Sequence, residues 1–181
     1  MLIIGITGTN GAGKGTVVDY LVQKKGFKHF SARAYITKLL EKEALKPDRE
    51  NLINKGNELR EKYGPSAITD LLYEGATKTG GDCIIESIRT VGEIESLKRK
   101  GDFKLLAVDA DPEIRYERIT KRGSDTDKIS YEKFREMEKL ETENEDPNKM
   151  NIFACMKRAD YVLTNNGSLD ELYKQIEEIS F

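Results

Sequence analysis

The stretch Gly8-Thr9-Asn10-Gly11-Ala12-Gly13-Lys14-Gly15-Thr16 follows directly on the apolar run Leu2-Ile3-Ile4-Gly5-Ile6. Its four glycines let the backbone curl so that successive N–H groups point at one phosphate chain, and Lys14 adds a positive charge for the β and γ oxygens. Residues 17–22 have apolar side chains at helical spacing, so a helix N-terminus would also face the phosphates. This order of strand, loop and helix predicts a phosphate-binding loop; the alternative is a glycine-rich turn without a ligand.

The loop sequence also narrows the kind of nucleotide site. A dinucleotide-binding fingerprint does not match, because Thr16 stands where its third glycine should be. Gly15 follows the lysine at the position where the general phosphate-loop motif has Ser or Thr. Thr16 is therefore the nearest hydroxyl for Mg²⁺. We expect ATP to contact Gly8, Asn10, Gly11, Ala12, Gly13, Lys14, Gly15 and Thr16.

Composition excludes several other classes of function. The chain has 181 residues, which predicts one domain, and its 30 basic and 32 acidic residues give a net charge of −2 with no long basic run. A nucleic-acid surface is therefore not expected. Two distant cysteines and one histidine offer neither a disulfide framework nor a zinc site. No signal peptide or membrane span is recognisable, so we expect a cytoplasmic protein that does not bind a membrane. We also expect a monomer or a small homo-oligomer.

Strand-like and helix-like segments alternate along the whole chain. Near-continuous apolar strands separated by helical segments predict an α/β fold with a parallel sheet covered by helices on both faces. Ligands of such sheets bind at the carboxyl ends of the strands. The expected strands are residues 2–7, 28–30, 82–86, 103–109 and 160–164.

With Lys14-Gly15-Thr16 closing the loop, the motif resembles the adenylate kinase branch of the nucleoside monophosphate kinases. The resemblance implies a single P-loop kinase-type domain with a five-stranded parallel sheet, a helical acceptor-binding lobe and a lid. On this chain the core would comprise residues 1–30, 80–122 and 150–181, the lobe about 31–79 and the lid about 123–149.

The expected lobe, residues 31–79, has a helical pattern that is broken at Pro47-Asp48 and at Gly64-Pro65-Ser66, where Asp48 and Ser66 are candidate helix caps. His29-Phe30-Ser31 is similar to the segment that leads into the acceptor lobe of the family. The resemblance implies that this lobe closes over a nucleoside monophosphate. Its candidate ligands are Ser31, Arg33, Lys38 and Arg60, but a basic residue at such a position is more often a solvated helix charge.

The segment Ile84-Ile85-Glu86-Ser87-Ile88-Arg89-Thr90 resembles the strand end of adenylate kinases that carries an Asp followed by a phosphate-gripping Arg. Glu86 beside the phosphate loop would order water bound to Mg²⁺, and Arg89 would present a fork to two oxygens of the acceptor phosphate. Alternatively, the two residues pair with each other or cap a helix over 90–100.

Asp111 and Pro112 begin a further expected helix, on which Arg118 and Arg122 share one face. Like charges four residues apart repel, and a polyanion between them removes that cost. The pair resembles the arginines at the lid hinge of the family, which implies that both hold ATP and stabilise the transferring phosphoryl group. A basic helix end in solvent is the alternative.

Residues 123–149 are strongly polar, so we expect a mobile segment. It would be either a solvated arm or a lid that keeps water from the γ-phosphate. Arg135 is similar in spacing to the lid arginine of adenylate kinases and is a candidate ATP ligand. The apolar anchors of the segment would be Ile129, Tyr131, Phe134, Met137 and Leu140.

The sequence thus indicates ATP-dependent phosphoryl transfer to a nucleoside monophosphate. Mg²⁺, Lys14, Arg118 and Arg122 would stabilise the reacting phosphoryl group, and Arg89 would hold the acceptor phosphate as a further catalytic residue. Two alternatives stay open. Residues 159–168 look like the ending of dephospho-coenzyme A kinases, whose alcohol acceptor would need a base. A nucleotide-dependent switch or regulatory ATPase would lack phosphate ligands in the acceptor lobe.

Overall fold

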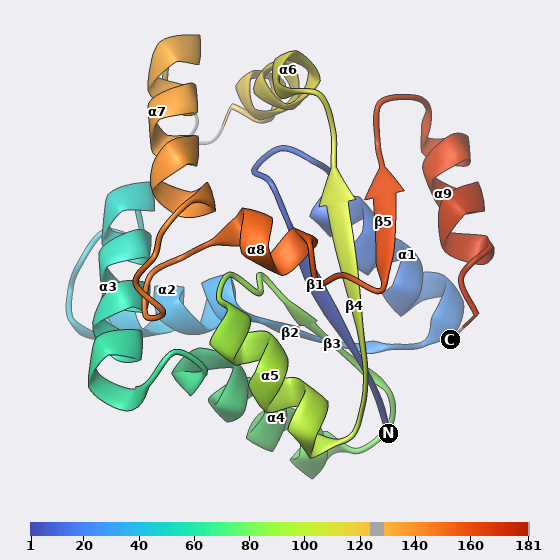
Figure 1. The fold of residues 1–181 in the computed structure, drawn as a ribbon, viewed down its shortest axis with the longest axis horizontal. Helices are drawn as coiled ribbons and strands as arrows, with labels where there is room; N and C mark the ends of the chain where they lie inside the picture. Colours follow the sequence, from blue (N-terminus) through green and yellow to red (C-terminus); the bar gives the residue numbers. More distant parts are fainter. Residues whose placement is uncertain (124–128, 181) are drawn as a thin grey trace.

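The computed structural model describes residues 1–123 and 129–180. Its sheet has the strand order β2-β3-β1-β4-β5, and every neighbouring pair is parallel (Figure 1). The predicted α/β class and parallel sheet are confirmed, and each strand end lies within one residue of its expected position. The strands are β1 (Leu2–Gly8), β2 (Lys28–Ser31), β3 (Cys83–Glu86), β4 (Asp102–Asp109) and β5 (Tyr161–Thr164).

The central position of β1 places the phosphate loop between two polar strand ends. Strand β1 pairs with β3 on one side, with Ile6 opposite Glu86, and with β4 on the other, with Gly8 opposite Val108. Asp109 ends β4 one residue later. Because parallel strands all end at the same edge of the sheet, the loop is flanked by the carboxylates of Glu86 and Asp109.

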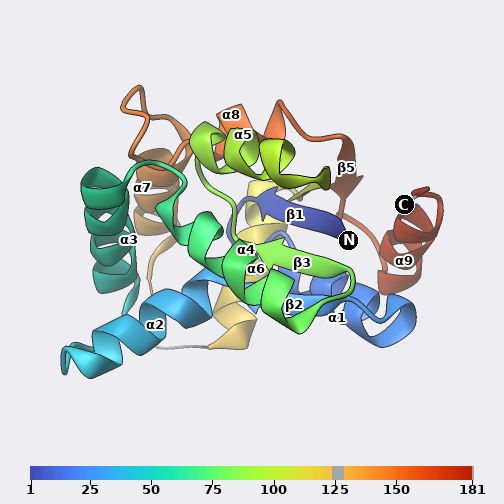
Figure 2. The same ribbon diagram turned by 90° about the horizontal axis from the view of Figure 1, so that it is seen from below.

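Helices cover both faces of the sheet, as Figure 2 shows from below. Successive side chains of a strand point to opposite faces, so Ile3 joins one hydrophobic core while Ile4 and Ile6 join the other. The first core lies under α4 (Ala67–Thr79), α5 (Val91–Lys100) and α8 (Ile152–Met156). The second lies under α1 (Lys14–Lys25) and α9 (Leu169–Glu177).

The expected acceptor lobe is divided between the sheet layer and a projecting part. Helix α4 packs on β2 and β3, and Ile68 and Leu72 belong to the same core as Ile3. The part that projects beside the carboxyl edge of the sheet consists of α2 (Ala32–Lys42) and α3 (Arg49–Tyr63). The projecting lobe is therefore shorter than residues 31–79, because the apolar face of α4 is needed to cover the sheet.

Helix starts follow the sequence signals in part. Asp48 accepts a hydrogen bond from Asn51 N at 2.9 Å, and Ser168 begins α9 with a capping box. The expected helix over 90–100 begins at Val91, and Thr90 caps it. Ser66 makes no capping bond, since its backbone is helical and its hydroxyl donates to Asp70. The Asp111 side chain likewise leaves α6 (Pro112–Arg122) uncapped.

The segment expected to be a mobile lid contains a packed helix, α7 (Tyr131–Thr142). Residues 124–128 of that expected lid lie outside the described residues. Leu140, expected as an apolar anchor, is 69% exposed, whereas Phe134, Glu138 and Glu141 are buried. Despite its polar composition, α7 is packed against the rest of the protein, because two of its acidic residues are buried as ion pairs with arginines from other elements. Within the described residues, no helix is long and apolar enough to cross a membrane.

Candidate functional site

The phosphate loop is shaped by glycines that no other residue could replace without strain. Gly8 has a φ of 131°, and a Cβ there would collide with the carbonyl oxygen of Val108. Gly13 has a φ of 99°, and a Cβ there would collide with the amide of Asn165. That amide donates to Ala12 O at 2.8 Å, so the residue after β5 holds the loop from outside.

Lys14 begins α1 and folds back over the loop. Its Nζ donates to Gly8 O at 2.9 Å and to Thr9 O at 2.7 Å, which holds the ammonium at the centre of the loop. Removal from solvent lowers the pKa of Lys14 to about 8, and the nearby charge of Arg89 acts in the same direction.

This shifted pKa predicts an alkaline loss of activity. Lys14 is protonated below about pH 8 and neutral above it, so the cation that would contact the phosphates disappears as pH rises. We expect kcat/KM for ATP to fall above about pH 8, because that ratio reports groups of the free enzyme. The measurement is a pH–rate profile of the wild type beside Lys14→Arg, whose guanidinium stays charged. An alkaline limb shared by both proteins would contradict the assignment to Lys14.

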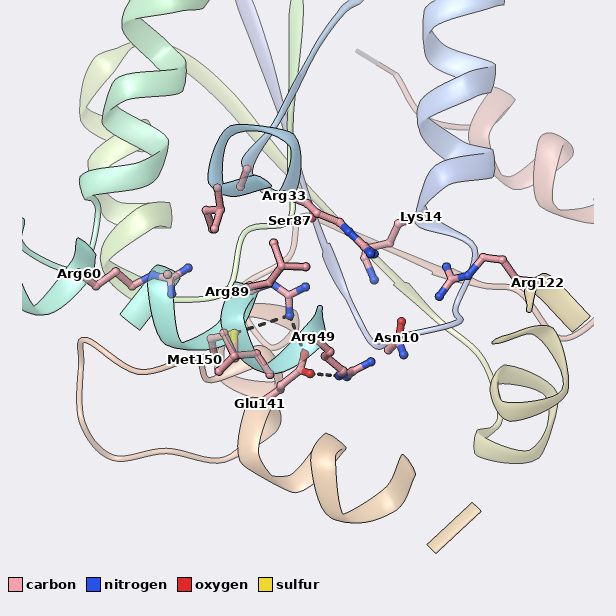
Figure 3. A pocket seen from close by; sticks show the side chains of 15 residues that line it. Asn10, Lys14, Arg33, Arg49, Arg60, Ser87, Arg89, Arg122, Glu141 and Met150 are labelled. Carbon is pink, nitrogen blue, oxygen red and sulfur yellow. Dashed lines mark hydrogen bonds and ion pairs between the residues drawn. The ribbon is translucent and has the colours of Figure 1, made fainter. Parts of the chain in front are cut away.

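Two cavities meet at the loop. The loop cavity is bounded by the phosphate loop, Glu86 and Arg118, and the lobe cavity extends between α2, α3 and α7. Six residues line both cavities, so the two form one continuous site: Asn10, Lys14, Arg33, Ser87, Arg89 and Arg122. A ligand bound over the loop and one bound between α2 and α3 would therefore meet near Lys14 (Figure 3).

The lobe cavity combines cations with an apolar wall. The apolar side chains of Ile36, Leu52 and Ile53 come from α2 and α3. The positive charges come from α1, α2, α3, the turn after β3 and α6: Lys14, Arg33, Arg49, Arg60, Arg89 and Arg122. Such a site suits a ligand that has both a flat apolar group and phosphate oxygens.

Three buried donors at this site have no hydrogen-bond partner among the described residues. They are Asn10 Nδ2, Arg49 Nε and Arg118 Nη1. A buried donor without an acceptor is costly, so each of these atoms marks a place where a ligand oxygen would be bound favourably. Asn10 and Arg118 line the loop cavity, and Arg49 lines the lobe cavity. Ligand oxygens that accept hydrogen bonds would therefore be bound favourably in both cavities.

The loop cavity also has oxygens suited to Mg²⁺. Thr16 and Glu86 both line it. The Oε2 of Glu86 forms a hydrogen bond with His29 Nε2 at 3.0 Å. Burial pushes the pKa of Glu86 upward, but the hydrogen bond and charge of His29, with Lys14 and Arg89, hold it below its usual range. An ionised carboxylate and a hydroxyl fit a hard cation. The described residues contain no cluster of three metal-ligating side chains, so Mg²⁺ would need water and phosphate to complete its shell.

The turn after β3 is strained where it enters the site. Ser87 has a φ of 73°, and both Ser87 N and Ile88 N donate to Ile6 O at 3.0 Å. A non-glycine residue in the left-handed region is held there only by surrounding contacts, and such residues concentrate at functional sites. The turn directs Arg89 into the lobe cavity.

The structure brings together most of the residues expected from sequence, but three lie elsewhere. Lys38 is exposed on α2 and lines neither cavity, because Ile36 occupies the face that points inward. Arg135 pairs with Glu138 at 2.7 Å and borders a different cavity beside Asp109. Ser31 caps α2 by accepting from Ala34 N, and it lines neither cavity.

Arg60 reaches the lobe cavity but is already paired. It is 2% exposed and forms an ion pair with Glu93 at 3.2 Å, and Glu93 is fully buried. A buried arginine with a carboxylate partner serves to hold the wall of the cavity, and only part of its charge remains for a ligand.

Sequence reasoning missed Arg49, Glu141 and Met150, which all line the lobe cavity. One local signal existed for Arg49. It is the first residue of α3, directly after the cap Asp48, where the helix dipole disfavours a cation. For Glu141, the signal was its spacing of seven residues from Phe134, which places both on one helical face. The partners of these residues are distant in sequence.

Comparisons with known proteins agree with this architecture. A family model described as AAA domain matches residues 4–147. A UPF0200 protein of Sulfurisphaera tokodaii is 33% identical over 98% of this chain and 94% of its own length. Protein MJ1399 of Methanocaldococcus jannaschii, also named UPF0200, is 30% identical over 99% of this chain and 89% of its own.

Solved structures resemble the chain in fold. TT1252 from Thermus thermophilus has a TM-score of 0.60 at 24% identity, with 97% of this chain and 94% of that chain covered. Shikimate kinase from Bacteroides thetaiotaomicron has a TM-score of 0.53 at 14% identity, with 97% and 94% covered. Dephospho-CoA kinase from Campylobacter jejuni has a TM-score of 0.50 at 20% identity, with 98% and 97% covered. The fold is thus that of P-loop kinases. The chain belongs to the UPF0200 family, and the AAA-domain family model matches most of its length.

Proposed function

We propose that this protein transfers the γ-phosphoryl group of ATP to a nucleoside monophosphate, giving ADP and a nucleoside diphosphate. The observation that carries the proposal is the continuity of the two cavities at Lys14, with arginines on the lobe side as well as on the loop side. A protein that only hydrolysed ATP would have no use for an extension of the site beyond the loop that carries Arg49 and an apolar wall.

In the proposed reaction an oxygen of the acceptor phosphate attacks the γ-phosphorus in line. A new P–O bond forms as the bond from the γ-phosphorus to the β-γ bridging oxygen breaks, and ADP leaves with that electron pair. Lys14, Arg118 and Arg122 would neutralise charge on the transferring group, while the loop N–H groups hold the β-phosphate. Mg²⁺, held near Thr16 and Glu86 largely through water, would supply further charge neutralisation.

The carboxylates of the site bear on whether the acceptor must lose a proton to a base. Burial raises the pKa values of Glu86 and Glu141, but His29 near the first and Arg89 and Arg49 near the second outweigh that effect and hold both pKa values below the usual range. Such carboxylates are weak bases at neutral pH. An alcohol acceptor, as in the dephospho-coenzyme A alternative, would need a base, whereas a phosphate acceptor is already an anion and needs none.

A coupled assay of ADP release tests the proposal directly. The acceptors are AMP, CMP, UMP, the deoxynucleoside monophosphates and dephospho-coenzyme A, each compared with ATP alone. We expect release to be stimulated by at least one nucleoside monophosphate. Stimulation by dephospho-coenzyme A alone would favour the hydroxyl acceptor, and slow release that no acceptor changes would favour a regulatory ATPase.

Replacement of Arg89 by alanine should weaken the binding of the acceptor far more than the binding of ATP. Arg89 points into the lobe cavity, and a charge-assisted contact of its guanidinium with phosphate contributes about 2 kcal/mol. We expect the acceptor KM to rise roughly 30-fold with a much smaller change for ATP. Lys38→Ala is the matched control, because Lys38 lies on the same lobe but outside the cavities. Equal increases in both KM values would place Arg89 on the ATP side.

A further inference from the structure

Glu141 places a carboxylate between two arginines of the lobe cavity, as Figure 3 shows. Its Oε2 accepts a hydrogen bond from Arg89 Nη1 at 2.7 Å, and its Oε1 accepts one from Arg49 Nη2. The Glu141 side chain is only 5% exposed. The contact therefore lies inside the cavity, and Glu141 comes from α7, which is distant in sequence from both arginines.

The two arginines are only partly satisfied by this carboxylate. Arg49 uses Nη2 on Glu141, but its buried Nε has no hydrogen-bond partner among the described residues. Arg89 adds a weak contact from Nη1 to the sulfur of Met150 at 3.7 Å. One carboxylate has two oxygens and one negative charge, whereas a phosphate monoester has three terminal oxygens and close to two charges at neutral pH. A phosphate would match two arginine forks better than Glu141 does.

Glu141 can compete with a phosphate for the two arginines because its carboxyl group is ionised. Burial raises the pKa of this carboxyl, yet the charges of Arg89 and Arg49 outweigh burial and hold the pKa below its usual range. Glu141 is therefore an anion under ordinary conditions. An acceptor phosphate that reaches the arginines must take over their hydrogen bonds from this anion.

We propose that Glu141 determines which acceptors bind. It holds Arg49 and Arg89 in ion pairs until a phosphate monoester displaces it, so acceptors without a phosphate monoester do not bind in the lobe cavity. This inference rests on the proposed function, in which those arginines bind the acceptor phosphate. Separating a buried carboxylate from two arginines is costly, and only a ligand that pairs with both arginines offsets the cost. A neutral nucleoside leaves the ion pairs in place.

The test is the binding of inorganic phosphate, measured by calorimetry on the full chain without ATP. Glu141→Gln keeps the shape of the side chain and removes the charge that competes with phosphate. We expect this variant to bind phosphate about tenfold or more tightly than the wild type, because the displacement step is weakened. Its melting temperature should also rise more on addition of phosphate, since tighter binding to the folded state stabilises it more.

Two further variants locate the effect. Glu138→Gln is the matched control: Glu138 is a buried acid on the same helix, but it pairs with Arg115 and lines neither the loop cavity nor the lobe cavity. We expect its phosphate affinity to stay near that of the wild type. Adding Arg49→Ala to Glu141→Gln should abolish the gain, whereas phosphate bound only at the loop would not depend on Arg49, which lines the lobe cavity but not the loop cavity.

The outcomes separate this inference from the proposed reaction. Unchanged phosphate affinity in Glu141→Gln would overturn the role of Glu141 even if nucleoside monophosphates are phosphorylated. An equal gain in Glu138→Gln would also overturn it, because the cause would then be a general loosening of α7. Tighter binding in Glu141→Gln alone supports the role of Glu141, and it does so whether or not the acceptor assay finds turnover.

Discussion

Lys14→Ala is expected to lower kcat by roughly 10²-fold or more while the fold is retained. Lys14 Nζ is held by two carbonyl oxygens of the loop, where it would contact the β and γ oxygens of ATP, and an alanine supplies no charge there. Because the contact strengthens as charge moves onto the transferring group, the loss should fall mainly on kcat. Steady-state kinetics with the acceptor found by the ADP-release assay measure it.

The control for this variant is Lys24→Ala, which removes the same charge from an exposed position in the last turn of the same helix. Its kcat should match the wild type, and circular dichroism should show that both variants are folded. Retention of activity within about threefold of the wild type in Lys14→Ala would contradict the phosphate-loop assignment.

The largest expected loss of stability is that of Glu93→Ala. Glu93 is fully buried; its Oε1 accepts from Arg60 Nε at 3.3 Å and Nη2 at 3.2 Å. Its Oε2 accepts from the backbone N–H groups of Arg89 at 2.6 Å and Thr90 at 3.1 Å. Alanine would leave the Arg60 charge buried without its partner, so we expect the free energy of unfolding to fall by about 3–5 kcal/mol.

Urea unfolding measures this loss, with Glu95→Ala as the control on the same helix. Glu95 is exposed, so its removal should change the free energy of unfolding by no more than about 0.5 kcal/mol. A loss below about 1 kcal/mol in Glu93→Ala would mean that the cavity wall does not depend on this ion pair. The result bears on the site, because Glu93 also fixes the backbone from which Arg89 extends.

The fold was predictable because its signals are local. Strands β1, β3 and β4 are short apolar runs, and the order of strand, glycine-rich loop and helix is contained in the first 25 residues. The packing of α7 was harder to predict, because this helix is polar in composition and its buried face includes two glutamates. Hydrophobic periodicity does not register a carboxylate that is buried because an arginine from another element neutralises it.

The sequence by itself determined the parallel sheet, the phosphate loop and the position of Lys14. The loop and Lys14 depend on residues within one strand–loop–helix unit, where backbone conformation and side-chain spacing are set by near neighbours. The parallel sheet follows from the alternation of strand-like and helix-like segments along the chain. Only the tertiary structure decided that Arg49, Arg89 and Glu141 share one cavity, and that Lys38 and Arg135 do not line it. The ion pairs of that cavity join residues 92 and 52 positions apart, and no local pattern specifies such partners, because they meet only when separate elements pack at the same edge of the sheet.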